Sequence, residues 1–155
     1  MVSDARAAAA SVVDPELRVV TIGDLGIVRD VRAGADGRVT VTITPTYAGC
    51  PAMDVIRADI RAALAAAGHA DAEVVTVLSP PWSTDHITDA GRAKLAATGI
   101  APPEHTGTVT LALSPRCPLC GSPDTAQLSR FGSTACKALW RCRSCGEPFD
   151  QVKAY

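Results

Sequence analysis

In the first part of the chain, the apolar positions follow two different periods. Valine and isoleucine alternate with threonine over residues 39–44, which is the pattern of a strand with one buried face. After Pro51, apolar side chains recur at helical spacing as far as Ala67, which predicts an amphipathic helix that Gly68 ends. Further strands are expected at residues 27–32 and 73–78, and further helices at residues 3–13 and 88–98. Together these elements predict an α/β (α+β) domain.

A second, smaller module is expected after the Pro102-Pro103 pair, which has the composition of a linker. Residues 108–113 alternate between polar and apolar side chains, so we expect them to begin this module as a strand. Residues 126–131 and 138–141, with a turn at Gly132, predict a short β-hairpin. The expected domains are residues 1–104 and residues 105–155.

The composition favours a packed globular chain, and the charge does not favour nucleic acid as a partner. Hydrophobic residues make up 47% of the 155 residues and charged residues 20%, so a folded core is expected. The formal net charge is -1, which argues against general binding to polyanions. Residues 1–104 contain nine basic and thirteen acidic side chains, whereas residues 105–155 contain six and three. The second module could therefore dock on an acidic partner or on the acidic first part of the chain.

The sequence favours a cytoplasmic location. No stretch approaches the apolar length of a membrane span, and the alanine-rich start lacks the basic region and leucine-rich core of a secretion signal. Thiols stay reduced in the cytoplasm, so the six cysteines suggest metal or redox chemistry more than disulfides.

Four of the cysteines form two matching pairs, each with two intervening residues and a following glycine. This spacing lets both thiolates of a pair reach one ion, and the glycine permits a tight turn. Four thiolates in a tetrahedron suit Zn²⁺; iron in a rubredoxin-like site, two disulfides and four free thiols are the alternatives. Such a site is closed to substrate, so its expected role is structural. The predicted zinc ligands are Cys117, Cys120, Cys142 and Cys145.

The two remaining cysteines are Cys50 and Cys136. Pro51 is of a type favoured at the first position of a helix, so Cys50 is expected at or next to the helix N-cap. There the helix dipole would lower the pKa of the thiol, with a buried cysteine acting as a small hydrophobe as the alternative. Cys136 could be a spare metal ligand, a redox thiol or a packed side chain.

The other polar residues form no recognisable catalytic constellation. The three histidines are scattered without metal-ligand spacing, and there is no phosphate-binding glycine loop or Ser-His-Asp arrangement. Asp14 and Glu16 could act beside Cys50, with capping or turn roles as the alternative. We therefore expect a protein that is not an enzyme.

Several segments resemble known families. The Asp14-Pro15-Glu16 run, residues 23–28 and residues 44–51 resemble the small domain of iron–sulfur carrier and assembly factors of the SufT type. Residues 79–85, 99–103, 131–137 and 146–150 are similar to the D-subunit family of the phenylacetyl-CoA epoxidase (ring 1,2-phenylacetyl-CoA oxygenase) system.

The resemblance implies a small three-stranded sheet with flanking helices, followed by a C-terminal β zinc ribbon. It also implies an accessory subunit in aerobic phenylacetate catabolism that helps mature the oxygenase or reductase subunit and catalyses no step itself. Cys50 matches the cysteine of the assembly-factor motif, so the resemblance gives it transient transfer of iron or an iron–sulfur cluster. His86 stands where the family has a tryptophan, which opens a role for His86 as an added ligand.

Three other functions remain open alternatives. The chain could be a structural docking subunit of the oxygenase complex with no metal-transfer role. It could be a nucleic-acid-binding ribbon, which the charge disfavours, or a redox protein that uses Cys50 and Cys136 as a dithiol. The expected partners are the oxygenase and reductase subunits, with no nucleic acid and no membrane, and a second copy could form a homodimer.

Overall fold

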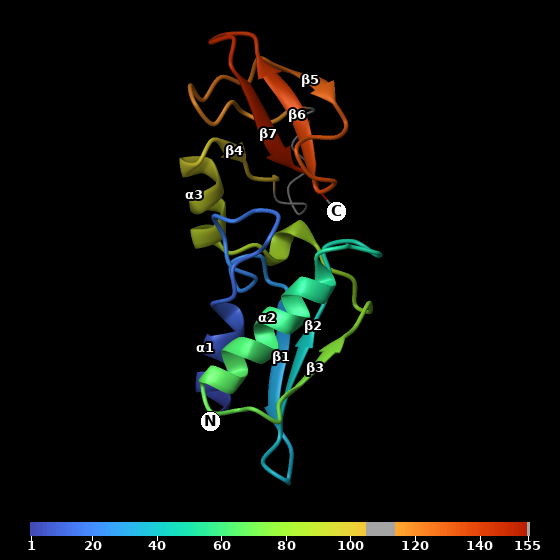
Figure 1. Cartoon of the computed structure of the whole chain (residues 1–155). Helices are drawn as coiled ribbons and strands as arrows, with labels where there is room; N and C mark the ends of the chain where they lie inside the picture. The colour runs from blue at the N-terminus through green and yellow to red at the C-terminus, as the bar shows by residue number, and fades with distance from the viewer. Residues whose placement is uncertain (105–113, 155) are drawn as a thin grey trace. The chain divides into compact units, whose positions relative to one another are not determined.

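The computed structural model describes residues 1–104 and 114–154, which fold as two compact units, Met1–Thr88 and Asp89–Tyr155 (Figure 1). This division lies before the expected boundary at residue 104 and groups residues 89–104 with the ribbon. The reason is strand pairing, since a short strand in that segment joins the sheet of the second unit. The strand expected at residues 108–113 lies outside the described residues. No helix within the described residues is long and apolar enough to cross a membrane.

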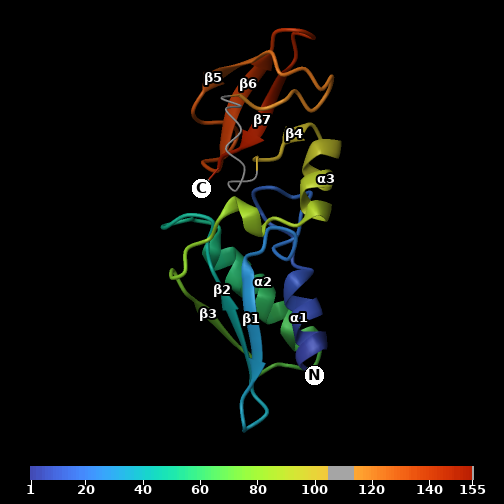
Figure 2. The same ribbon diagram turned by 180° about the vertical axis from the view of Figure 1, so that it is seen from behind.

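The first unit contains the expected three-stranded sheet. Strands β1 (Val28–Ala33) and β2 (Val39–Ile43) are antiparallel, and β3 (Glu73–Thr76) adds in parallel to β2, giving the order β1-β2-β3. The connection from β2 to β3 runs through helix α2 (Met53–Ala66), because parallel neighbours require a crossover. Figures 1 and 2 show α2 and helix α1 (Val2–Ala10) on the same face of this sheet.

The alternating pattern of β2 and the helical stripe of α2 meet in the core of this unit. Val39, Val41 and Ile43 are buried on one face of β2, while the threonines between them are only partly buried. The apolar stripe of α2 supplies the opposing layer. Its buried members are Met53, Ile56, Ile60 and Leu64.

Helix α1 ends at Ala10, three residues before the predicted end. The Ala10 carbonyl accepts from the N–H of Gly23 at 3.1 Å, and the Val12 carbonyl accepts from Ile22 at 2.8 Å. Val13 then forms a β-bridge with Thr21. After Ala10 the backbone therefore bonds to residues 21–23 rather than continuing the helix. The hairpin-like turn between these two segments contains Asp14 and Glu16.

The second unit is a ribbon preceded by helix α3 (Asp89–Ala97), close to the predicted helix at residues 88–98. Strands β5 (Thr125–Ser129) and β6 (Lys137–Cys142) form the predicted hairpin. The sheet is larger than expected, because β7 (Pro148–Val152) pairs antiparallel with β6 and β4 (Ile100–Ala101) pairs in parallel with β7. One cluster of its core consists of Ala101, Cys117, Cys142 and Phe149, with Trp140 packed against them.

Candidate functional site

The four predicted metal ligands come together in the second unit. Their sulfur atoms all lie within 4.8 Å of one another. The sulfurs of Cys117 and Cys145 are 3.8 Å apart, and those of Cys120 and Cys142 are 3.5 Å apart. A regular tetrahedron with Zn–S bonds of about 2.3 Å has sulfur–sulfur edges of about 3.8 Å. The residues present therefore fit one tetrahedral ion with four thiolate ligands.

The local backbone of each pair explains this convergence. Gly121 and Gly146 have φ values of 74° and 83°, in the left-handed region that glycine adopts without strain. Their N–H groups bond back to the carbonyls of Cys117 and Cys142, at 2.8 and 3.0 Å, which closes the two turns. The Cys145 N–H points at the Cys142 sulfur at 3.5 Å and is the main cause that lowers the pKa of Cys142 to about 6.

Cys50 lies apart from this cluster in sequence, on the loop between β2 and α2 in the first unit, and its side chain is half-buried. Helix α2 begins at Met53 with Ala52 as its N-cap, so Cys50 lies two residues before the cap rather than at or beside it. The Cys50 carbonyl accepts from the Met53 N–H at 3.3 Å, so Pro51 occupies a turn that leads into the helix.

The environment of Cys50 raises the pKa of its thiol above the ordinary value, contrary to the lowering expected at a helix start. Burial is the largest cause, because it removes water from the thiolate. The Ala52 backbone and the Tyr47 side chain act in the opposite direction and lower the pKa, while the negative charges of Glu16 and Asp14 raise it further. The expected effect of the helix start is present in the Ala52 contact, but burial and two carboxylates outweigh it.

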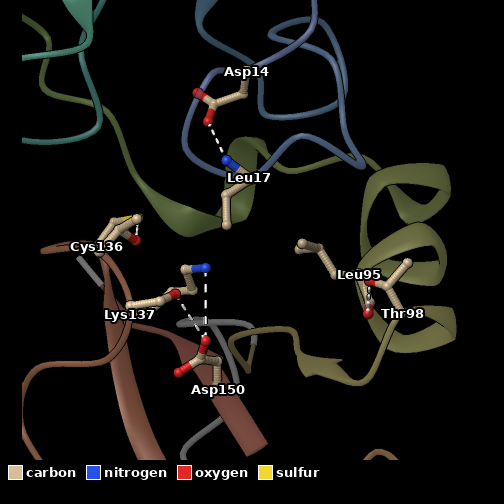
Figure 3. Close-up of polar contacts among 9 residues, drawn as sticks. Asp14, Leu17, Leu95, Thr98, Cys136, Lys137 and Asp150 are labelled. Carbon is tan, nitrogen blue, oxygen red and sulfur yellow. Dashed lines mark hydrogen bonds and ion pairs between the residues drawn. The ribbon is translucent and has the colours of Figure 1, made fainter.

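Asp14 has the turn role considered from sequence, and it also lies within electrostatic reach of Cys50. One oxygen of its buried carboxylate, Oδ1, accepts from the N–H groups of Glu16 and Leu17, at 2.9 and 2.7 Å. Figure 3 shows the contact with Leu17. Asp14 and Glu16 therefore belong to one turn, and the negative charges of both raise the pKa of the Cys50 thiol.

His86 and Cys136, the other two auxiliary candidates, both have identifiable structural contacts. Nδ1 of His86 accepts from the Ser83 N–H at 3.0 Å, within a short 3-10 helix at Thr84–His86. A ligand role for His86 stays a prediction, and it would use Nε2. Cys136 is buried in the second unit, and its thiol shares a 3.0 Å hydrogen bond with the Thr134 hydroxyl (Figure 3).

The sequence did not predict the effect of Tyr47 on Cys50 or the ion pair between Lys137 and Asp150. Tyr47 belongs to the quoted motif around Cys50, yet its effect on the pKa of that thiol depends on how the loop folds back. Lys137 is buried and lies 3.7 Å from Asp150, which also accepts from the Ser133 hydroxyl at 3.0 Å (Figure 3). A lysine that begins a strand is usually exposed, so only the partner thirteen residues later reveals the pair.

Comparison with known proteins assigns each unit to a described family. The family described as "Iron-sulfur cluster assembly protein" matches residues 3–77, and the family described as "PaaD zinc beta ribbon domain" matches residues 101–153. The first unit also resembles two solved structures, which cover 61% of this chain each. A domain of unknown function from Bacillus anthracis has a TM-score of 0.56, 32% identity and 90% of its chain covered. A conserved hypothetical protein from Thermotoga maritima has a TM-score of 0.52, 27% identity and 93% of its chain covered.

Relatives match either nearly all of the chain or its first half. An Escherichia coli (strain K12) protein named as the D-subunit of 1,2-phenylacetyl-CoA epoxidase is 48% identical over 141 residues, which cover 90% of this chain and 85% of that protein. Fe-S protein maturation auxiliary factors of Porphyromonas gingivalis and Bacillus subtilis are 36% and 42% identical. They cover 55% and 50% of this chain, and 81% and 76% of their own lengths. Names of auxiliary factors agree with the expectation of a non-catalytic accessory protein. The chain therefore belongs to the D-subunit family of 1,2-phenylacetyl-CoA epoxidase, in which an iron–sulfur cluster assembly domain precedes a PaaD zinc β-ribbon.

Proposed function

We propose that this chain matures a component of a phenylacetyl-CoA epoxidase system in aerobic phenylacetate catabolism, by delivering iron or an iron–sulfur cluster to the oxygenase or reductase subunit. The observation that carries this proposal is the environment of Cys50. Its thiol lies outside the closed four-cysteine cluster, within the assembly domain, and two carboxylates and a tyrosine act on it.

The chemistry around Cys50 suits a ligand that must bind and release its cargo. Iron and iron–sulfur clusters take thiolate ligands, so the Cys50 thiol loses its proton as the sulfur–iron bond forms. Because burial raises the pKa of this thiol, the protonated form competes with the metal and favours release when the client supplies its own ligands. When the sulfur–iron bond breaks, the thiol takes its proton back, and Cys50 returns to its starting state.

In this proposal the ribbon binds zinc for structure alone. Cys117, Cys120, Cys142 and Cys145 would hold the ion, which would supply binding energy to a unit with a small apolar core. Structural zinc in comparable peptides contributes on the order of 10–16 kcal/mol. Metal analysis of the purified chain should give one zinc per molecule, and replacing Cys117 with Ser should abolish it.

The test of the transfer role is a comparison of Cys50→Ser with Cys136→Ala. Each variant would be co-expressed with the oxygenase and reductase subunits in cells that lack the wild-type chain. We expect Cys50→Ser to lower the iron content of the client by at least fivefold, and Cys136→Ala to leave it within twofold of wild type. Normal iron in both subunits with Cys50→Ser would exclude the proposed mechanism.

A structural docking subunit with no metal-transfer role is the second candidate. It is favoured by the closed cysteine cluster, which leaves the ribbon no open ligand position, and by apolar side chains exposed on the ribbon, including Leu128 and Phe131. In that case Cys50→Ser would support normal client iron, while chelation of zinc would dissociate the complex.

A further inference from the structure

The loop between β5 and β6 presents an aromatic side chain to solvent. Phe131 is 69% exposed, the highest value among the large apolar side chains of the described residues. Leu128, three residues earlier on β5, is 56% exposed. Single exposed apolar residues are common on protein surfaces, so the inference depends on how this loop is built.

The loop is fixed by a polar network beneath it. The Gly132 N–H bonds to the Lys137 carbonyl at 2.8 Å, and the Ser133 hydroxyl donates to Asp150 at 3.0 Å. Lys137, with a side chain 7% exposed, forms an ion pair with the same carboxylate (Figure 3). A Cβ atom at Gly132 would lie 2.5 Å from Asp150 Oδ1, so the backbone itself packs onto this carboxylate. A largely buried carboxylate with several partners thus holds the loop in one conformation.

The ring of Phe131 has a cation beside it. Lys153 Nζ lies 4.5 Å from the ring centroid and donates to the Ala135 carbonyl at 2.8 Å. Arg130, the preceding residue, is exposed. Aromatic and arginine side chains are enriched at interface hot spots, so an exposed ring with a cation beside it suits binding to a partner.

The charges favour an acidic protein surface over nucleic acid. Nucleic-acid surfaces need free cations along a track and usually several aromatic rings for stacking. Here Arg143 lies 3.6 Å from the Asp124 carboxylate, and Nε of Arg141 donates to the Gly146 carbonyl at 3.2 Å. Arg130 is exposed directly before Phe131, and residues 105–155 contain six basic and three acidic side chains, so a pocket for one ring with carboxylates at its rim would be complementary.

We propose that Phe131, Arg130 and Lys153 form a docking surface, and that its occupant is an acidic patch on the epoxidase subunit that receives the metal. This inference rests on the proposed function for the identity of the client. It assigns contact with the client to the ribbon and leaves metal transfer to Cys50 in the other unit.

The test measures binding of the full zinc-loaded chain to the purified oxygenase and reductase subunits by biolayer interferometry. Phe131→Ser is compared with Leu78→Ser, a matched control with a leucine that is 62% exposed in the first unit. We expect Phe131→Ser to raise the Kd at least tenfold and Leu78→Ser to change it less than twofold. Raising NaCl from 50 to 300 mM should weaken wild-type binding, and Lys153→Gln should reduce that salt dependence. Zinc content and melting temperature of each variant verify folding.

The outcomes separate this inference from the proposed function. A Phe131→Ser variant that binds like wild type, or a wild-type chain that binds neither subunit, would overturn the docking surface. Tighter binding to a single-stranded DNA 30-mer than to either subunit, lost in Phe131→Ser, would assign the surface to nucleic acid instead. If Phe131→Ser abolishes docking and Cys50→Ser docks normally but still loads the client with iron, the docking surface holds and the transfer mechanism fails.

Discussion

At the scale of single residues, the molecule uses acidic side chains in two different ways. One carboxylate oxygen of Asp14 accepts hydrogen bonds from the backbone of its own turn. Its negative charge, with that of Glu16, raises the pKa of the Cys50 thiol. Asp150 instead neutralises a buried lysine and holds a loop. The first arrangement tunes a thiol, and the second fixes a surface.

The raised pKa of Cys50 predicts slow alkylation near neutral pH. The thiolate is the reactive form, so a higher pKa moves the rise of the rate to more alkaline pH. Burial is the main cause and the negative charge of Glu16 adds to it, so Glu16→Gln should lower the pKa and speed the reaction of Cys50 at pH 7.5 by a few fold. Iodoacetamide labelling with mass spectrometry of the Cys50 peptide measures this. An unchanged or slower rate, with Glu73→Gln as the surface control, would contradict the electrostatic argument.

Breaking the Lys137–Asp150 pair should destabilise the ribbon. Lys137→Met leaves a largely buried carboxylate without its cation, which costs about 3 kcal/mol in the free energy of unfolding. Lys94→Met, at an exposed position on α3, should cost less than about 0.5 kcal/mol. Urea unfolding of the zinc-loaded chains tests both values. Equal stability of the two variants would mean that the pair contributes nothing to the fold.

At the scale of elements, the periodicity of apolar residues predicted the helices and strands that have a local pattern. It did not predict strands that form only because a distant segment pairs with them. The alternation that identified β2 and the stripe that identified α2 are both present in the core. Strands β4 and β7 were not predicted. Strand β4 has only two residues, Ile100–Ala101, which are too few to show a period, and β7 forms by pairing with β4 and β6. Helix α2 begins at Met53, two residues after the predicted start at Pro51. A proline indicates that a helix begins nearby, but it does not show whether a turn comes before the first helical residue.

The core of the first unit should depend strongly on α2. Ile60 is fully buried, so Ile60→Ala removes apolar surface and leaves a cavity, which should lower the free energy of unfolding by about 2–4 kcal/mol. Val55, on the same helix, is 49% exposed, and Val55→Ala should cost under about 0.5 kcal/mol. Chemical denaturation followed by circular dichroism distinguishes them, and a cost below about 1 kcal/mol for Ile60→Ala would contradict the assigned core.

At the scale of the whole molecule, two families are joined in one chain, and the auxiliary factors show that the first occurs without the second. The Bacillus subtilis relative has 76% of its length covered by half of this chain. The cysteine spacing predicted the four-cysteine cluster, because each pair is a local turn and the hairpin of β5 and β6 between the pairs brings the two turns together. The surroundings of Cys50 could not be predicted in the same way, since Tyr47, Asp14 and Glu16 are brought to it by the fold.

The two units should therefore respond differently to metal removal. A strong zinc chelator should unfold the ribbon, in which two of the proposed ligands belong to a small apolar cluster, and leave the assembly domain folded. Two-dimensional NMR of the full chain would show amide signals of Gly121 and Phe149 collapsing while those of Val41 and Ile60 persist. Cooperative loss of both sets would show that the units fold as one.

The unequal burial of the four cluster cysteines has a kinetic consequence. Cys117 and Cys142 are buried, whereas Cys120 and Cys145 are exposed, so each pair has one buried and one exposed member. Oxidants and competing chelators would therefore attack from one side and detach two ligands before the shielded pair is reached. With a zinc ion in the proposed site, we would expect exchange to pass through a half-released state, so that loss of the ion in air depends first on Cys120 and Cys145.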